Sequence, residues 1–101
     1  PTGCYFPVDD YTFEAMLTTI QLQTFEFDKE SVAMQIVGAN CMYAKQIKTI
    51  MLLFDYEDTK LDFAKFAYHH TYDIENYYIV NQAFTFSLSI DELNEYINSL
   101  D

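Results

Sequence analysis

An aromatic–x–aromatic step recurs three times along this chain, and its spacing constrains the fold more than any other feature. The steps are Phe25-Glu26-Phe27, Phe54-Asp55-Tyr56 and Phe84-Thr85-Phe86, and their first residues lie 29 and 30 positions apart. A constant period of about 20 to 50 residues is typical of repeated helical units. We therefore predict an all-α bundle of about six short helices, built from helix pairs of about 30 residues with the aromatic steps as hinges.

We expect the two rings of each step to point to opposite sides of an extended hinge and to fill two different seams between helices. The alternation in Thr24-Phe25-Glu26-Phe27 is also compatible with a short β-strand, and three such segments could pair. Each run is shorter than the roughly 5–6 residues of a typical strand, which favours the helical interpretation.

Apolar spacing and capping residues predict where the helices begin. The first covers about residues 10–23, with Asp9 and Asp10 at its N-cap, and the second follows a cap at Asp28. The third and fourth cover about residues 42–53 and 58–70. A fifth follows Asp73, and Ser89 with Glu92 forms a capping box that opens the sixth. The fourth has a broad apolar stripe, which predicts a central helix with neighbours on two sides.

Length and charge limit the possible functions. A chain of 101 residues is one domain, in which residues 1–8 form an N-terminal arm. It contains 16 Asp and Glu, five Lys and no Arg, with a net charge of −11, which disfavours nucleic acids and anionic lipid surfaces. The longest apolar run, residues 50–54, is far too short to cross a membrane, so no membrane insertion is expected. The acidity suits a basic partner, and it also suits an ordinary solvated surface.

No residue cluster forms a catalytic signature, so we expect no enzyme and no cofactor. No serine lies in a Gly-x-Ser-x-Gly motif. On a helix the adjacent His69 and His70 point about 100° apart, although His70 and Asp73 offer a weak metal-binding pair. The acidic residues 55, 57 and 58 could hold a cation weakly, but they do not fit a calcium-binding EF-hand loop.

Tyrosines near an amide are the clearest candidates for binding. Tyr72 and Tyr78 flank Asn76, and exposed rings beside amides suit a sugar or a peptide. We predict these three residues as the ligand- or partner-binding site. Tyr77 shares the expected inward face with Ile74, and we assign it to the core.

Longer motifs resemble a bacterial family known as domain of unknown function 4476. The resemblance is carried by residues 46–50 and 53–68, then by Asp73, Asn76-Tyr77-Tyr78 and Phe84-Thr85-Phe86, and it covers nearly the whole chain. It implies a C-terminal helical module of a longer secreted, periplasmic or envelope protein of the Bacteroidetes type. The start Pro1-Thr2-Gly3 resembles a processed end, which fits a missing upstream segment. The family implies no substrate, cofactor or catalytic residue.

Cys4 and Cys41 are the only cysteines. In the cytosol they would be two thiols, whereas outside it they could form a bridge. The envelope context implied by the resemblance favours a Cys4–Cys41 disulfide that ties the N-terminal arm to the bundle.

The sequence thus favours a non-catalytic interaction module that binds a protein or peptide partner, possibly a basic one. The alternative is a small-ligand or glycan-binding domain that uses exposed tyrosines. The sequence leaves the oligomeric state open.

Overall fold

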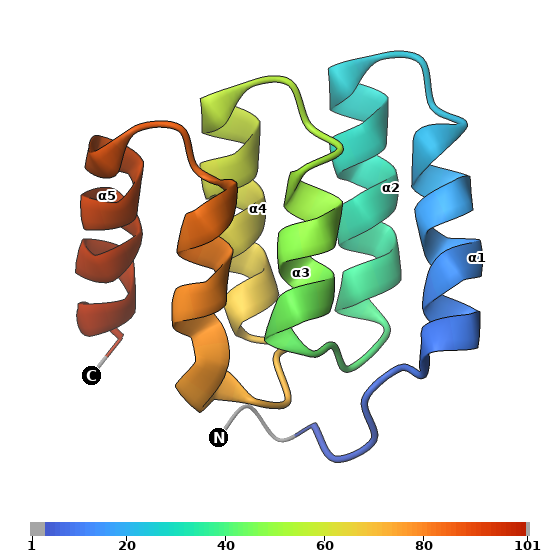
Figure 1. The fold of residues 1–101 in the computed structure, drawn as a ribbon, viewed down its shortest axis with the longest axis horizontal. Coiled ribbons are helices and arrows are strands. Elements are labelled where there is room, and N and C mark those ends of the chain that lie inside the picture. Colours follow the sequence, from blue (N-terminus) through green and yellow to red (C-terminus); the bar gives the residue numbers. More distant parts are fainter. Residues whose placement is uncertain (1–3, 101) are drawn as a thin grey trace.

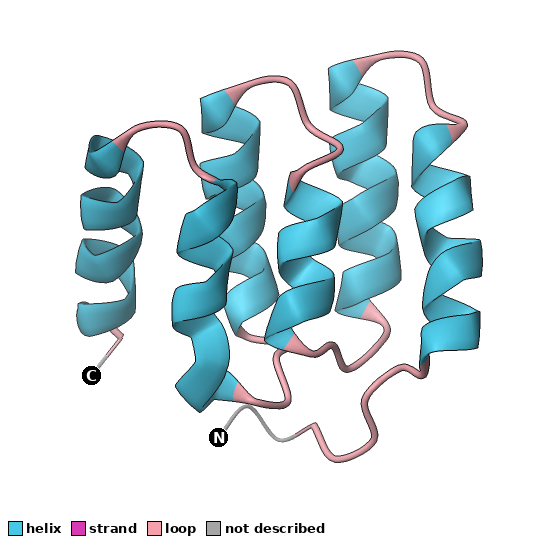
Figure 2. Cartoon of the chain, viewed as in Figure 1, coloured by secondary structure: helices cyan, strands magenta, loops and turns pink. Residues whose placement is uncertain are grey.

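Six helices and no strand are found in residues 4–100, the part of the chain that this computed structural model describes (Figure 2). The all-α prediction is confirmed, and the alternative in which the aromatic steps pair as strands is wrong. The helices are α1 (Asp10–Gln21), α2 (Glu26–Gly38), α3 (Ala44–Met51), α4 (Glu57–Tyr68), the 3₁₀ helix η1 (Ile74–Ala83) and α5 (Ser87–Asn98).

The helices form a flat assembly of 33 × 31 × 18 Å, about two helices thick. Figure 1 shows the chain rising and descending three times, through α1 and α2, then α3 and α4, then η1 and α5. Helix α4 packs against α2, α3, η1 and α5, which is the central position that its broad apolar stripe predicts. Whether the three helix pairs represent a repeated unit stays a prediction.

The core is continuous from α1 to α5. Phe63 on α4 is fully buried at its centre and packs edge-to-face on Phe54, with ring centroids 5.4 Å apart. Ile20 of α1 and Leu93 of α5 close the two ends of the same cluster. Phe13 of α1 and Ile47 and Met51 of α3 are also buried and belong to this cluster.

The helix expected after Asp73 is present, and it is a 3₁₀ helix over its whole length. Its buried residues are Tyr77, Val80 and Ala83, which are three positions apart. A three-residue spacing matches the 3.0 residues per turn of a 3₁₀ helix, so one continuous side faces the core. Tyr77 is buried as predicted, and Tyr78 points outward with 65 % of its surface exposed.

Asp9 and Asp73 occupy the N-cap positions of α1 and η1, whereas the caps predicted at Asp28 and Ser89 are wrong. The Asp9 carboxylate accepts from the Thr12 amide at 2.7 Å, as a local N-cap should. Helix α2, however, begins at Glu26, so Asp28 lies inside its first turn. Helix α5 begins at Ser87, so Ser89 lies inside it and forms no capping box with Glu92.

The loops along the lower edge are tied to one another by the backbone. The Val8 amide donates to Cys41 O at 2.9 Å, and the Tyr72 amide donates to Met42 O at 2.8 Å. The buried Gln46 side chain also donates to Val8 O, at 2.8 Å. Cys4 and Cys41 are joined by a disulfide, with Cα atoms 5.5 Å apart. Residues 4–8 of the N-terminal arm are therefore fixed to α3 and the segment that precedes it.

Candidate interaction surface

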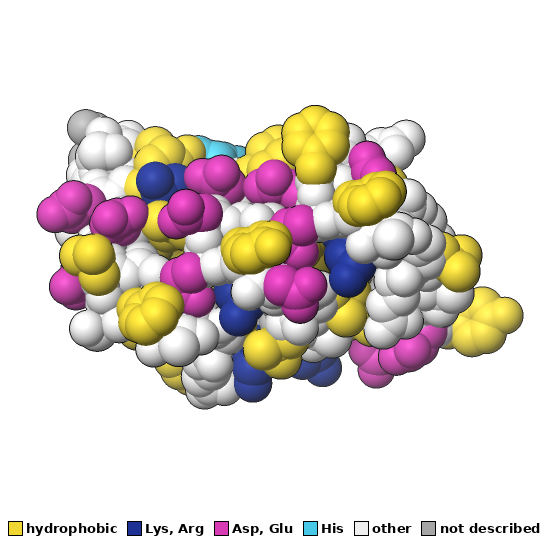
Figure 3. All heavy atoms as spheres, turned by 90° about the horizontal axis from the view of Figure 1, so that it is seen from above, with side chains coloured by type: hydrophobic (Ala, Val, Ile, Leu, Met, Phe, Trp, Pro, Cys, Tyr) yellow, Lys and Arg dark blue, Asp and Glu magenta, His cyan; other side chains and the backbone are white. Residues whose placement is uncertain are grey.

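Three loops lie along the upper edge of the molecule (Figure 1). These loops and the helix ends beside them expose a row of large apolar side chains. We call this row the aromatic rim. It consists of Leu22, Phe25, Phe27, Leu52, Tyr56, Phe86 and Leu88. Seen from above, yellow apolar side chains lie among magenta acidic ones across this edge (Figure 3). Large exposed apolar groups gathered on one edge are a feature of contact surfaces.

Most rings of the aromatic steps do not fill seams between helices, so that expectation is wrong. Phe54 is buried and Phe84 packs partly against the core. The other four rings are exposed, by 69 % for Phe25, 77 % for Phe27, 65 % for Tyr56 and 61 % for Phe86. The physical reason is their position at helix starts, where a side chain projects from the outer end of the first turn.

Phe25, Tyr56 and Phe86 occupy the same position in their helices, because each is the N-cap residue. The helices that follow begin at residues 26, 57 and 87, at intervals of 31 and 30 positions. The helix starts are therefore not in register with the aromatic steps. Phe25 is the first residue of its step, whereas Tyr56 and Phe86 are the last residues of theirs.

Glutamate side chains hold neighbouring rim loops together. The Glu26 carboxylate accepts from the Asp55 amide at 3.0 Å and from the Tyr56 amide at 3.0 Å. The Glu57 carboxylate, two helices further along the chain on α4, accepts from the Thr85 amide at 2.9 Å and from the Phe86 amide at 3.0 Å. These bonds fix the backbone of Tyr56 and Phe86, so their rings are presented from rigid helix ends.

The rim is negatively charged. Partial burial alone would raise the pKa of Glu26, but the amides of Tyr56 and Asp55, with the Thr59 hydroxyl and Lys29, outweigh it and lower the pKa. The pKa of Glu57 is lowered in the same way by Phe86, Ser89, Thr85 and Lys60 against the effect of burial. Both carboxylates are therefore ionised at neutral pH. Exposed Asp28, Asp55 and Asp58 add to this charge.

The three residues predicted to bind a ligand lie away from the rim, before and within η1. Tyr72 is half exposed and meets the Tyr43 ring edge-to-face, with centroids 5.7 Å apart. The Asn76 amide donates to the Asp73 carboxylate at 3.0 Å. Tyr78 is exposed beside a cavity that Tyr72 and Asn76 do not line. Binding of a ligand by these three residues together stays a prediction.

The histidine and acidic clusters do not assemble a metal centre in the described part of the chain. No group of three or more His, Cys, Asp or Glu that could hold a metal ion is present in residues 4–100. His69 Nε2 lies 2.6 Å from the Tyr96 hydroxyl. Burial, together with the neighbouring His69, lowers the pKa of His70. Neither histidine is brought to Asp73, whose carboxylate instead accepts from the Ala44 amide at 2.8 Å and caps α3.

Sequence reasoning missed the rim because it treated all paired rings as interior residues. One local signal could have identified it: Phe25-Glu26 and Tyr56-Glu57 are both an aromatic residue followed directly by glutamate, 31 positions apart. Both rings precede the first helical residue, so they lie outside the stripe that faces the core.

Fold and surface together define a small, disulfide-linked all-α domain of paired helices with an exposed aromatic edge. A family model described as a domain of unknown function, DUF4476, matches residues 7–97, and the chain belongs to that family. No curated protein and no solved structure matches the chain. Among the described residues, no helix is long and apolar enough to cross a membrane.

Proposed function

We propose that this domain is a non-catalytic interaction module that binds a basic protein or peptide partner across the aromatic rim. The observation that carries the proposal is the alignment of Phe25, Tyr56 and Phe86 at three successive helix starts, each with more than 60 % of its surface exposed. Rigid aromatic side chains contribute strongly to protein interfaces because they bury a large area and lose little conformational entropy.

Charge complementarity supports a basic partner. Acidic side chains surround the rings, and the whole chain carries a net charge of −11 with no arginine. A negative field of this kind speeds the approach of a cationic surface and disfavours anionic ones. The rings would then contribute apolar contact area, while the carboxylates orient lysine or arginine side chains of the partner.

The disulfide supports a location outside the cytosol. Disulfides form and persist in oxidising compartments, and the Cys4–Cys41 bond fixes the arm in this structure. We propose the periplasm, the cell envelope or the secreted fraction of a bacterium as the place where the module acts. The proposed role as the C-terminal module of a longer protein is consistent with that location.

The proposal is tested by capture from a bacterial envelope extract with the purified domain as bait. A Phe25→Ala/Tyr56→Ala/Phe86→Ala variant removes the rings and should lose the captured partner. Because all three rings are exposed, its thermal unfolding should stay close to that of the parent domain. The captured protein should have a basic surface, and its retention should fall as salt is added.

A Tyr72→Ala/Tyr78→Ala variant is the matched control, because it removes exposed rings outside the rim. Retention of the same basic partner by this control, together with its loss from the rim variant, supports the proposal. Capture that is equal for the parent and the rim variant contradicts it. Loss of the partner from the tyrosine control alone would instead favour the site predicted from the sequence around Asn76.

A further inference from the structure

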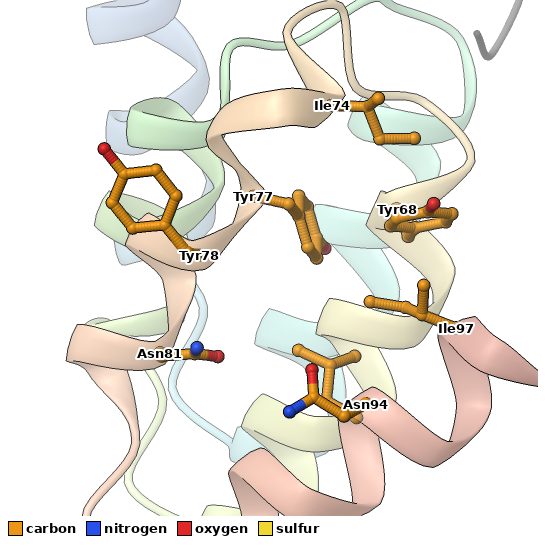
Figure 4. Close-up of a pocket in the computed structure, with 8 residues that line it drawn as sticks. Tyr68, Ile74, Tyr77, Tyr78, Asn81, Asn94 and Ile97 are labelled. Carbon is orange, nitrogen blue, oxygen red and sulfur yellow. The ribbon is translucent and has the colours of Figure 1, made fainter.

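A cavity of about 210 Å³ lies between η1 and α5, and none of the residues that line it belongs to the aromatic rim (Figure 4). Its apolar walls come from Tyr68 on α4, Tyr77 on η1 and Leu93 and Ile97 on α5. Tyr68 and Tyr77 meet edge-to-face there, with ring centroids 5.1 Å apart. The cavity therefore has a rigid, largely aromatic wall.

Two carboxamides provide its polar groups. Asn81 reaches in from η1 and Asn94 from α5, so that they approach the cavity from opposite sides (Figure 4). Asn81 is partly buried and Asn94 is exposed, and neither side-chain amide forms a hydrogen bond within residues 4–100. Each carboxamide can donate two hydrogen bonds and accept two, so the pair can serve hydroxyl groups in either role. The Tyr77 hydroxyl is not available, because it donates to Ala64 O.

The cavity is neutral within a strongly acidic chain. None of the residues that line it carries a charge, although the chain has 16 Asp and Glu and five Lys. An anionic ligand would be repelled by the net charge of −11. A cationic ligand would be attracted by that charge at long range but would meet no counter-charge among the residues that line the cavity. The chemistry therefore suits an uncharged ligand with both an apolar face and several hydroxyl or amide groups.

We propose that this cavity binds a single neutral pyranose ring, with the C–H face of the sugar on the tyrosine wall and its hydroxyls on Asn81 and Asn94. The volume of about 210 Å³ corresponds to roughly seven waters at about 30 Å³ each, and it is smaller than the cavities that hold drug-sized ligands. It therefore accommodates one ring of a glycan. This site is independent of the aromatic rim.

The test is a ¹H–¹⁵N NMR titration of the full chain with methyl β-D-glucopyranoside and with N-acetylglucosamine. At least one of the two should give saturable shifts centred on residues 74–81 and 93–97. Glucosamine, which is cationic, and glucuronate, which is anionic, should shift these amides far less. Shifts of equal size with the charged sugars would overturn the neutral ligand class.

Two single variants, Asn81→Ala and Asn94→Ala, should each weaken sugar binding about five- to tenfold, because each removes a neutral hydrogen-bonding group. Asn98→Ala on the same helix α5 is the matched control, since Asn98 is exposed and does not line the cavity. Undiminished binding by both cavity variants, or no saturable shift with either neutral sugar, would overturn the proposal. The rim variant should bind the sugar as the parent does, which separates this site from the proposed partner surface.

Discussion

Phe54 and Tyr56 belong to the same aromatic step and occupy opposite environments. Phe54 is 3 % exposed and packs on Phe63, whereas Tyr56 is 65 % exposed at the start of α4. Replacing Phe54 with Ala should lower the free energy of unfolding by about 3–5 kcal/mol, because the change leaves a cavity between α3 and α4. Tyr56→Ala should change it by less than about 0.5 kcal/mol. Chemical denaturation measures both, and equal midpoints for the two variants would contradict the assigned environments.

Individual residues also show where sequence reasoning succeeds. The Asp9 cap could be predicted because its partner, the Thr12 amide, lies three positions away. Tyr77 could be assigned to the core because it belongs to an apolar stripe on one helix face. Neither prediction requires any knowledge of contacts between distant parts of the chain.

At the scale of the helix, the loops are organised by carboxylates that come from a neighbouring element. Glu57 on α4 holds the start of α5, and no local pattern reveals that contact because the bonded residues are 28 and 29 positions apart. This is why the cap predicted at Ser89 is wrong: Phe86 occupies the N-cap position of α5, and the distant Glu57 holds its amide. The rim could not be predicted for the same reason. The cap predicted at Asp28 is wrong for a different reason, because α2 begins two residues earlier, after Phe25.

Glu57→Gln should lower the free energy of unfolding by about 1 kcal/mol at neutral pH, because charge-assisted hydrogen bonds to Thr85 and Phe86 become neutral ones. Asp58→Asn is the matched control. It removes the same charge from the same first turn of α4, so its effect on the helix dipole is similar. Thermal or chemical denaturation should show a larger loss of unfolding free energy for Glu57→Gln than for Asp58→Asn. Equal losses would show that the hydrogen bonds from Glu57 to the next loop contribute nothing to stability.

The effect of Glu57→Gln should depend on pH in a defined direction. The pKa of Glu57 in the folded state lies below its ordinary value of 4.5, so the folded protein binds a proton less readily than the unfolded chain. The stabilisation by Glu57 is therefore complete above pH 4.5 and is lost as the pH falls through the folded-state value. The difference in the free energy of unfolding between the parent and the Glu57→Gln variant should therefore become smaller as the pH falls below 4.5. A constant difference from neutral to acidic pH would contradict the link to ionisation.

Across the whole molecule, the disulfide joins two parts of the chain that are 37 positions apart. In the chain-entropy model, closing a loop of this length contributes about 4 kcal/mol. A Cys4→Ser/Cys41→Ser variant should therefore unfold at a markedly lower denaturant concentration than the oxidised parent. Reductant should lower the midpoint of the parent and leave that of the variant unchanged. Complete reduction of the disulfide is verified by mass spectrometry. If the fully reduced parent keeps the denaturation midpoint of the oxidised parent, the disulfide does not stabilise the fold.

The row of glutamates along the upper edge stops at α5. Helices α2 and α4 begin with Glu26 and Glu57, but α5 begins with Ser87, whose short side chain offers no carboxylate to another loop. If a fourth helix pair were added beside α5, no carboxylate at position 87 could accept hydrogen bonds from the amides of its loop, as Glu26 and Glu57 do for the loops before it. A glutamate at position 87 is therefore where a protein engineer would begin in order to join a further helix pair to this edge.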